Sequence, residues 1–317
     1  MRFLVTGGAG FLGAALANRL VLEGHVVNVL DDLSNGRCEH LLPAVHFVKG
    51  DIDNIPLLWS LLHDVDCVYH LAARVSVAQS ILHPRDYNRV NVGGTVSLME
   101  AMRDTGVRRV VFTSSGAIYG RQHNEPVHED HVPHPDSPYA VSKWAAEQYI
   151  HTIGELYGLE TVALRIFNAY GPRQSLPLSH APVVPRFMQQ ALTGGSVVLF
   201  GDGSQTRDFV YVEDVLAALI RAATAHHINR SVLNIGSGVE TSINNLVNQI
   251  EIVTGCKVNR IYNQTNIGGV PRLVADISRA NELLDFKPQM TLTDGLRCML
   301  VEDIRFKNLT LKKIPLA

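Results

Sequence analysis

Thr6-Gly7-Gly8-Ala9-Gly10-Phe11-Leu12-Gly13 is the stretch that decides the fold of this chain. The apolar run 2–5 before it predicts a buried strand, and the apolar spacing over 14–22 after it predicts a helix. Gly8, Gly10 and Gly13 suit a tight turn, a close approach of backbone to a pyrophosphate, and close helix-on-strand packing. The stretch therefore predicts a dinucleotide-binding turn, with a helix N-terminus that offers N–H groups to phosphate.

A carboxylate stands where such a fold would bind a ribose. The next strand is expected at 25–30 and is closed by Asp31, after Gly24 ends the helix. This spacing suits a carboxylate that accepts from ribose hydroxyls, and Asp32 beside it adds negative charge where the 2′-phosphate of NADP would lie. The pair therefore favours NAD over NADP.

Composition narrows the class of protein. The chain has 317 residues, which allows two domains, and its 28 basic and 30 acidic residues give a net charge of -2 without a basic run. A nucleic-acid or anionic-membrane partner has no electrostatic support. The four cysteines lack Cys-x-x-Cys spacing, and no apolar run reaches the length of a membrane span or signal segment. We therefore expect a cytoplasmic protein without a disulfide or metal site.

Strands and helices alternate along the first half of the chain. Helices are expected at 54–63, 85–105 and 138–157, and further strands at 45–48, 66–73, 107–115 and 160–167. Such alternation builds an α/β fold with a doubly wound parallel Rossmann sheet, which binds ligands beyond the carboxyl ends of its strands. Asp51 follows the third strand, where it could sit beside an adenine ring or cap the next helix.

The pattern changes after Gly171-Pro172. We expect residues 1–171 to form the cofactor domain and 172–317 a smaller α/β substrate domain, with 208–237 packing back onto the first. The remaining expected elements are a loose tail from 308 to 317, strands at 197–200, 231–235 and 258–262, and helices at 184–192, 242–254 and 277–284.

The residues with the clearest chemistry follow the fifth strand. That strand ends at Ser115, and Ser137-Pro138 marks a helix start that places Tyr139 and Lys143, four residues apart, on one helix face. A lysine ammonium beside a phenol lowers the pKa of the phenol, so Tyr139 is expected to act as a general base. Ser115 can then orient the same substrate hydroxyl.

Taken together, the motifs resemble the extended short-chain dehydrogenase/reductases of the NAD-dependent epimerase/dehydratase family, and within it the nucleotide-sugar 4-epimerases. They lie in order over about residues 1–284: Gly7/Gly10/Gly13, Asp31 ahead of Leu33-Ser34, Leu71-Ala72-Ala73, Asn91, Ser115 with Tyr119-Gly120, Tyr139/Lys143, Asn168-x-Tyr170-Gly171-Pro172-Arg173, and Gly201-Asp202-Gly203-x-Gln205-x-Arg207-Asp208.

The resemblance implies a set of site residues. The catalytic group would be Ser115, Tyr139 and Lys143, and the substrate would also contact Asn168, Phe200, Arg207 and Arg272. NAD would be bound by Gly7, Gly10, Phe11, Leu12, Gly13, Asp31, Asp32, Leu33, Ser34, Asp51, Ile52, Leu71, Ala72, Ala73, Asn91, Tyr139, Lys143 and Phe167.

The resemblance also implies the reaction and the assembly. C4 of a nucleotide sugar would be oxidised to a 4-keto intermediate and reduced again on its other face, with UDP-glucose and UDP-galactose as the first candidates. Asn266 stands where the subgroup has a second phosphate-binding Arg, so either Arg272 replaces it or Arg207 binds the diphosphate alone. Leu273 replaces a bulky aromatic residue, which leaves room for an N-acetyl group. The helices at 85–105 and 139–157 would form the interface of a homodimer.

Four alternatives were weighed against epimerisation. A dehydratase or a uronate decarboxylase needs carboxylates where this chain has Gly116 and Ala117, so both are disfavoured. A non-catalytic NAD-binding regulator is disfavoured because Ser115, Tyr139 and Lys143 are all retained. A 4-keto-sugar reductase, which shares these catalytic groups, stays open.

Overall fold

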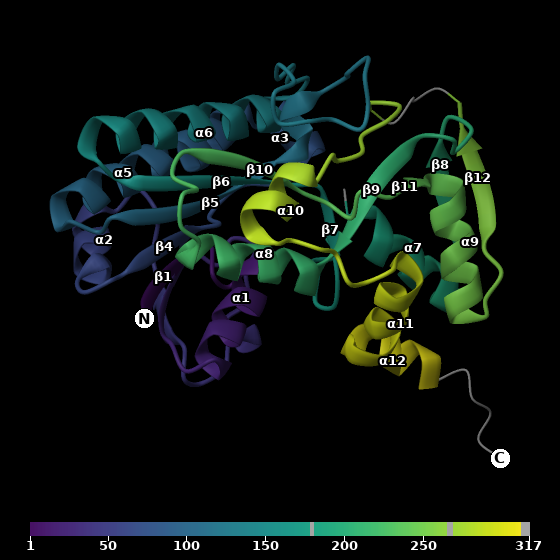
Figure 1. Ribbon diagram of the computed structural model, residues 1–317. Helices are drawn as coiled ribbons and strands as arrows, with labels where there is room; N and C mark the ends of the chain where they lie inside the picture. The colour runs from purple at the N-terminus through teal and green to yellow at the C-terminus, as the bar shows by residue number, and fades with distance from the viewer. Residues whose placement is uncertain (178–180, 265–268, 312–317) are drawn as a thin grey trace.

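A computed structural model describes residues 1–177, 181–264 and 269–311. Its main sheet has seven parallel strands in the order β10-β6-β5-β4-β1-β2-β3 (Figure 1). These are β1 (Arg2–Thr6), β2 (Val26–Asp31), β3 (His46–Lys49), β4 (Cys67–His70), β5 (Arg109–Ser115), β6 (Glu160–Ile166) and β10 (Ser231–Ile235). The predicted doubly wound Rossmann sheet is confirmed.

Helices cover both faces of this sheet. On one face lie α2 (Ile55–Leu62), α5 (Gly94–Thr105) and α6 (Pro138–Tyr157), and on the other α1 (Phe11–Leu22) and α8 (Val212–Thr224) (Figure 1). Each face has its own apolar cluster, because strands buried on both sides carry apolar residues at successive positions. The sheet is thus rigid, and its carboxyl edge can hold functional groups in fixed places.

The helix expected at 85–105 is not regular. It consists of α4 (Pro84–Tyr87), a π-helical segment (Asn88–Gly93) and α5, and a short helix α3 (Val77–Leu82) precedes it. Two adjacent glycines with poor helix propensity, Gly93 and Gly94, lie at the junction. A methyl group on Gly94 would come within 2.3 Å of Ile52 Cγ2, so this glycine also lets the helix approach the sheet closely.

The second lobe carries two small sheets beside the main one (Figure 1). One contains β7 (Asn168–Tyr170), β9 (Thr206–Tyr211) and β11 (Glu240–Ser242), and the other β8 (Ser196–Phe200) and β12 (Asn259–Asn263). The helices of this part are α7 (Val183–Thr193), α9 (Ile243–Thr254), α11 (Leu292–Glu302) and α12 (Ile304–Leu311), whereas α10 (Ser278–Leu284) packs against β10 and α8. Two short 3-10 turns, Cys38–His40 and Gly116–Tyr119, complete the elements.

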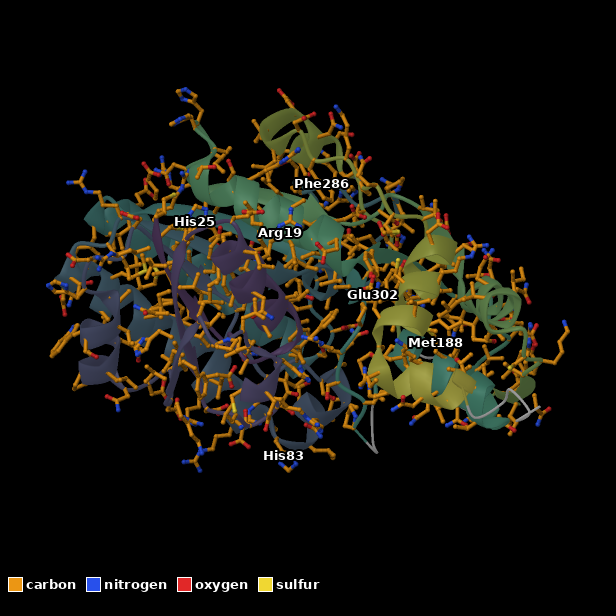
Figure 2. The ribbon with its side chains drawn as sticks, turned by 90° about the horizontal axis from the view of Figure 1, so that it is seen from below. Arg19, His25, His83, Met188, Phe286 and Glu302 are labelled. Carbon is orange, nitrogen blue, oxygen red and sulfur yellow. The ribbon has the colours of Figure 1, made fainter. Side chains whose placement is uncertain are left out.

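One apolar core runs from the main sheet into the second lobe. Met188 on α7 and Phe286 after α10 both belong to the cluster that also contains the strand residue Val5 (Figure 2). The chain returns to the main sheet through α8 and β10, while β9 pairs within the small sheet. A two-domain division at residue 171 stays a prediction. Within the described residues, no helix is long and apolar enough to cross a membrane.

The prediction of a loose tail from residue 308 is wrong for residues 308–311. Residues 308–311 belong to α12, which docks because Phe306 is fully buried and Asp303 accepts a hydrogen bond from the Arg173 backbone at 2.8 Å. The helix α11 before it was not predicted either. Residues 312–317 of the expected tail lie outside the described residues.

Candidate active site

The glycine turn is shaped by close backbone contacts. Gly7 has a φ of 67°, and a methyl group on it would lie 2.6 Å from the Ala72 backbone nitrogen. A methyl group on Gly13 would lie 2.2 Å from the Gly7 carbonyl oxygen. Gly8 packs against Val29 of β2 instead, so Gly7, Gly10 and Gly13 are the glycines that face the ligand side.

A cavity of about 360 Å³ opens above this turn, at the carboxyl edge of the main sheet. It brings together seventeen of the predicted site residues: Gly7, Gly10, Phe11, Leu12, Gly13, Asp31, Asp32, Ser34, Asp51, Ile52, Leu71, Ala72, Ala73, Ser115, Tyr139, Lys143 and Phe167. Asn54 rather than Asp51 caps α2, since the Leu57 backbone donates to Asn54 Oδ1 at 3.1 Å. The capping interpretation of Asp51 is therefore wrong, and its carboxylate lines the cavity.

Asp31 is fixed at the rim of this cavity. Its carboxylate accepts from the Ala9 backbone at 3.0 Å and from the Leu33 backbone at 2.8 Å. Burial raises the pKa of Asp31, while these two N–H groups act in the opposite direction. The Asp31 carboxylate is hydrogen-bonded to the glycine turn and can accept from the ribose hydroxyls of NAD. The glycines leave space for the pyrophosphate that larger side chains would occupy.

We expect Asp31→Asn to weaken NAD binding by about 10- to 150-fold, since a hydrogen bond to a charged group contributes roughly 1.5–3 kcal/mol. Asp64→Asn is the matched control, because Asp64 is exposed, pairs with Arg2 and does not line the cavity. Equilibrium titration with NAD and with NADP measures both variants. Unchanged NAD affinity in the Asp31 variant would contradict the assignment.

The catalytic candidates meet at the end of β5. The Ser137 side chain caps α6 by accepting from the Ala140 backbone at 3.3 Å, and Pro138 occupies the first turn. This start places Tyr139 beside Ser115, and both side chains line the cavity. Lys143, one turn further, is buried with its ammonium 4.2 Å from the centre of the Phe112 ring.

The electrostatics of this group differ from the sequence-based expectation. Burial lowers the pKa of Lys143 to about 7, with Glu147 acting in the opposite direction. Burial raises the pKa of Tyr139, against the effect of its hydrogen bond to Ser115. The expectation that Lys143 lowers the pKa of Tyr139 is therefore not met in this structure, where the groups that act on the phenol are Ser115 and Tyr87 and burial has the largest effect.

Six predicted residues do not line the cavity: Leu33, Asn91, Asn168, Phe200, Arg207 and Arg272. Asn91 is buried, and its amide binds the backbone N–H and C=O of Arg74 at 2.7 and 3.0 Å. Asn91 therefore fixes the backbone of Arg74, which lines the cavity. Leu33 contributes its backbone to Asp31, and Phe200 ends β8 in the second lobe.

The three polar substrate candidates belong to the second lobe. Asn168 Nδ2 donates to the Asp208 carbonyl oxygen at 3.1 Å, and the buried Asp208 carboxylate accepts from Ser237 and Gly238. Burial lowers the pKa of Arg207, and Glu125 and Asp136 are the acids that act on it. The Asp208 carboxylate is therefore held by hydrogen bonds from Ser237 and Gly238.

Arg272 pairs with an acidic side chain instead of facing the cavity. Its guanidinium binds Glu240 through two hydrogen bonds of 2.9 and 2.8 Å and the Glu125 carbonyl at 2.9 Å. The expectation that Arg272 replaces a missing phosphate-binding cation is not supported by these contacts, because Glu240 already neutralises its charge. Asn266 lies outside the described residues.

Sequence reasoning missed other residues of the cavity wall. They come from loops and strand ends and include Asn35, Gly36, Arg74, Val75, Val90, Thr113, Gln174, Ser175 and Pro182. Thr113 could have been found, since it stands two residues before Ser115 on a predicted strand. Arg74 and Gln174 carry no local signal, because only the folded chain brings them to the same wall.

The parallel sheet, the glycine turn with its carboxylate and the Ser-Tyr-Lys group define a class: Rossmann-fold enzymes of the short-chain dehydrogenase/reductase type. The family model "NAD dependent epimerase/dehydratase family" matches residues 3–236. The chain therefore belongs to the NAD-dependent epimerase/dehydratase family, as its motifs predicted.

Relatives in this family narrow the activity. The chain is 42% identical over 303 residues to the UDP-glucose 4-epimerase of Mycolicibacterium smegmatis, covering 93% of this chain and 96% of the relative. The Thermotoga maritima UDP-glucose 4-epimerase, solved with UDP-glucose, superposes with a TM-score of 0.92 at 36% identity, covering 98% of this chain and 100% of that one.

A third relative has a different sugar in its name. The Methanobrevibacter ruminantium UDP-N-acetylglucosamine 4-epimerase superposes with a TM-score of 0.90 at 34% identity, covering 97% of this chain and 98% of that one. The predictions of an NAD-dependent enzyme and of a nucleotide-sugar 4-epimerase are confirmed by these matches.

Proposed function

We propose that this chain interconverts UDP-glucose and UDP-galactose by inverting C4 of the sugar. The observation that carries the proposal is the contact between Tyr139 and Ser115 in the same cavity as the glycine turn and Asp31. A base beside a hydroxyl donor, next to a dinucleotide site, is what oxidation of a secondary alcohol requires. The named activity of the relatives supplies the sugar and its position.

Each catalytic group has a distinct role in this proposal. Tyr139 takes the proton of the sugar O4 and later returns it, while Ser115 hydrogen-bonds the same oxygen and holds it in place. NAD, when bound, supplies the acceptor and then the donor of the hydride at C4. Lys143 binds the nicotinamide ribose and, when protonated, stabilises the Tyr139 phenolate.

The diphosphate is assigned to Arg207 and Asn168. The Arg207 guanidinium lies beside Gly269, since a methyl group on this glycine would be 3.8 Å from Arg207 Nη2. Burial partly desolvates the guanidinium, and a partly desolvated cation attracts an anion more strongly than one in water. Phe200, at the end of β8, is proposed to contact the nucleotide. Arg272 is left out of this set because of its pairing with Glu240.

A direct assay tests the proposed function. The purified protein is incubated with UDP-glucose without added coenzyme, product is identified as UDP-galactose, and the absorbance spectrum measures bound nicotinamide. Epimer formation with protein-bound NAD supports the proposal. Turnover that requires added reduced coenzyme, with a 4-keto sugar as the substrate, would favour the reductase instead.

We predict that UDP-N-acetylglucosamine is also epimerised, with kcat/KM within about tenfold of that for UDP-glucose. Leu273 is smaller than the aromatic residue expected there, and a methylene-scale difference in a pocket discriminates only modestly. Leu273 is buried in an apolar cluster with Ile118 and Phe167, and Phe167 lines the cavity. Parallel assays on both sugars decide, and activity on UDP-glucose alone contradicts the prediction.

We propose that the chain assembles as a homodimer through α5 and α6. Val141 and Tyr149 on α6 are 49% and 47% exposed, and Val92 and Val96 along the neighbouring helical segment are half-buried. A second apolar stripe on a helix pair is a feature of a subunit interface. Sedimentation should give a dimer at micromolar concentration, and Tyr149→Lys should shift it toward monomer. A wild-type monomer would refute the assembly.

A further inference from the structure

Tyr87 is buried beside the catalytic group but belongs to none of the predicted motifs. It ends α4 and is 3% exposed. Its ring meets the Tyr139 ring edge to face, with the centroids 6.4 Å apart and the planes at 85°. Edge-to-face aromatic pairs are favourable and directional, so this contact restricts the orientation of the Tyr139 ring.

The hydroxyl of the same residue holds the cavity wall. Tyr87 donates a hydrogen bond of 2.6 Å to the Ser76 carbonyl oxygen, at the end of the segment 71–76. This segment has no regular secondary structure, residues 71–75 line the cavity, and Val75 is 65% exposed. Its place therefore depends on side-chain hydrogen bonds, from Asn91 to Arg74 and from Tyr87 to Ser76.

We propose that Tyr87 is a positioning residue for the reaction, which sets the orientation of Tyr139 through its ring and anchors the cofactor-side wall through its hydroxyl. Tyr139 must point its oxygen at one substrate hydroxyl, and small misplacements of a reacting group reduce the rate strongly. One side chain thus links the base to the wall of the cofactor site. The proposal rests on the proposed epimerase function.

Two variants separate the ring from the hydroxyl. Tyr87→Leu removes the aromatic edge, and we expect kcat for UDP-glucose to fall by about 10- to 100-fold while KM changes less than threefold. Tyr87→Phe keeps the ring, and we expect kcat to recover to within about threefold of wild type. Less NAD should be retained, because the Ser76 carbonyl keeps its Ser80 donor but loses the one from the cavity-side Tyr87. Kinetics, bound-NAD absorbance and thermal unfolding are measured on each variant.

Tyr262→Leu is the matched control, because Tyr262 is 45% exposed on β12, and its kcat should equal that of wild type. If Tyr87→Leu does not fold, Tyr87→Met replaces it, since the flexible Met side chain fills more of the space. An unchanged kcat in the Leu or Met variant, or equal losses in the Leu and Phe variants, would overturn the proposal. An inactive wild type would instead refute the proposed function.

Discussion

Replacing Tyr139 with Phe is expected to lower kcat at least ~100-fold, the loss typical when a general acid–base group is removed. The ring and its edge-to-face contact with Tyr87 remain, so folding and the bound NAD should be unaffected. Ser115 cannot take over, because a serine hydroxyl beside the substrate can donate a hydrogen bond but is a poor base near neutral pH. Steady-state kinetics with UDP-glucose measure the effect.

The matched control for this variant lies on the same helix. Tyr157→Phe makes the same chemical change at the exposed end of α6, where Tyr157 is 52% exposed, and should keep the wild-type kcat. Thermal unfolding of both variants should match wild type. An active Tyr139→Phe enzyme, with NAD bound and kcat within tenfold of wild type, would refute Tyr139 as the base.

Replacing Arg165 with Met is expected to lower the free energy of unfolding by about 3–5 kcal/mol, the cost of breaking a buried ion pair. Arg165 on β6 binds Glu147 on α6 at 2.7 Å, and both side chains are almost fully buried. Burial alone would lower the pKa of Arg165, but Glu147 holds it above its ordinary value. The Met variant leaves a buried carboxylate without its cation.

The Arg165 site also joins three neighbouring elements. Its guanidinium donates to the Tyr119 hydroxyl at 2.8 Å, and Ser114 donates to Glu147 at 2.6 Å. The Tyr119 hydroxyl in turn donates to Asn234 of β10 at 2.7 Å. In the described structure, loss of Arg165 therefore removes partners from both Glu147 and Tyr119.

Denaturant unfolding of two further variants tests the explanation. The double variant with Glu147→Leu and Arg165→Met should recover most of the loss, because it removes both charges together. Arg297→Met is the control, since the Arg297–Asp294 pair on α11 is 61% and 50% exposed and such pairs contribute about 0–1 kcal/mol. A loss below ~1 kcal/mol for Arg165→Met alone would contradict the prediction.

Local sequence patterns determined the framework of this protein. The glycine turn, Asp31 at the end of the second strand, and Tyr139 with Lys143 four residues later were all predictable, because each depends on spacing within one turn, strand or helix. The alternation of strands and helices gave the sheet, since connections between parallel strands follow few topologies. The family resemblance then added the reaction.

Tertiary packing decided what no local spacing encodes. Arg272 pairs with Glu240, Tyr87 meets Tyr139, and Arg165 binds Glu147 only after segments distant in the sequence come together. The pKa values of Tyr139 and Lys143 likewise depend on burial by the surrounding chain, which raises the first and lowers the second. A pattern in sequence fixes which side chains share a helix face, whereas the partner of a charge and its solvation are properties of the whole fold.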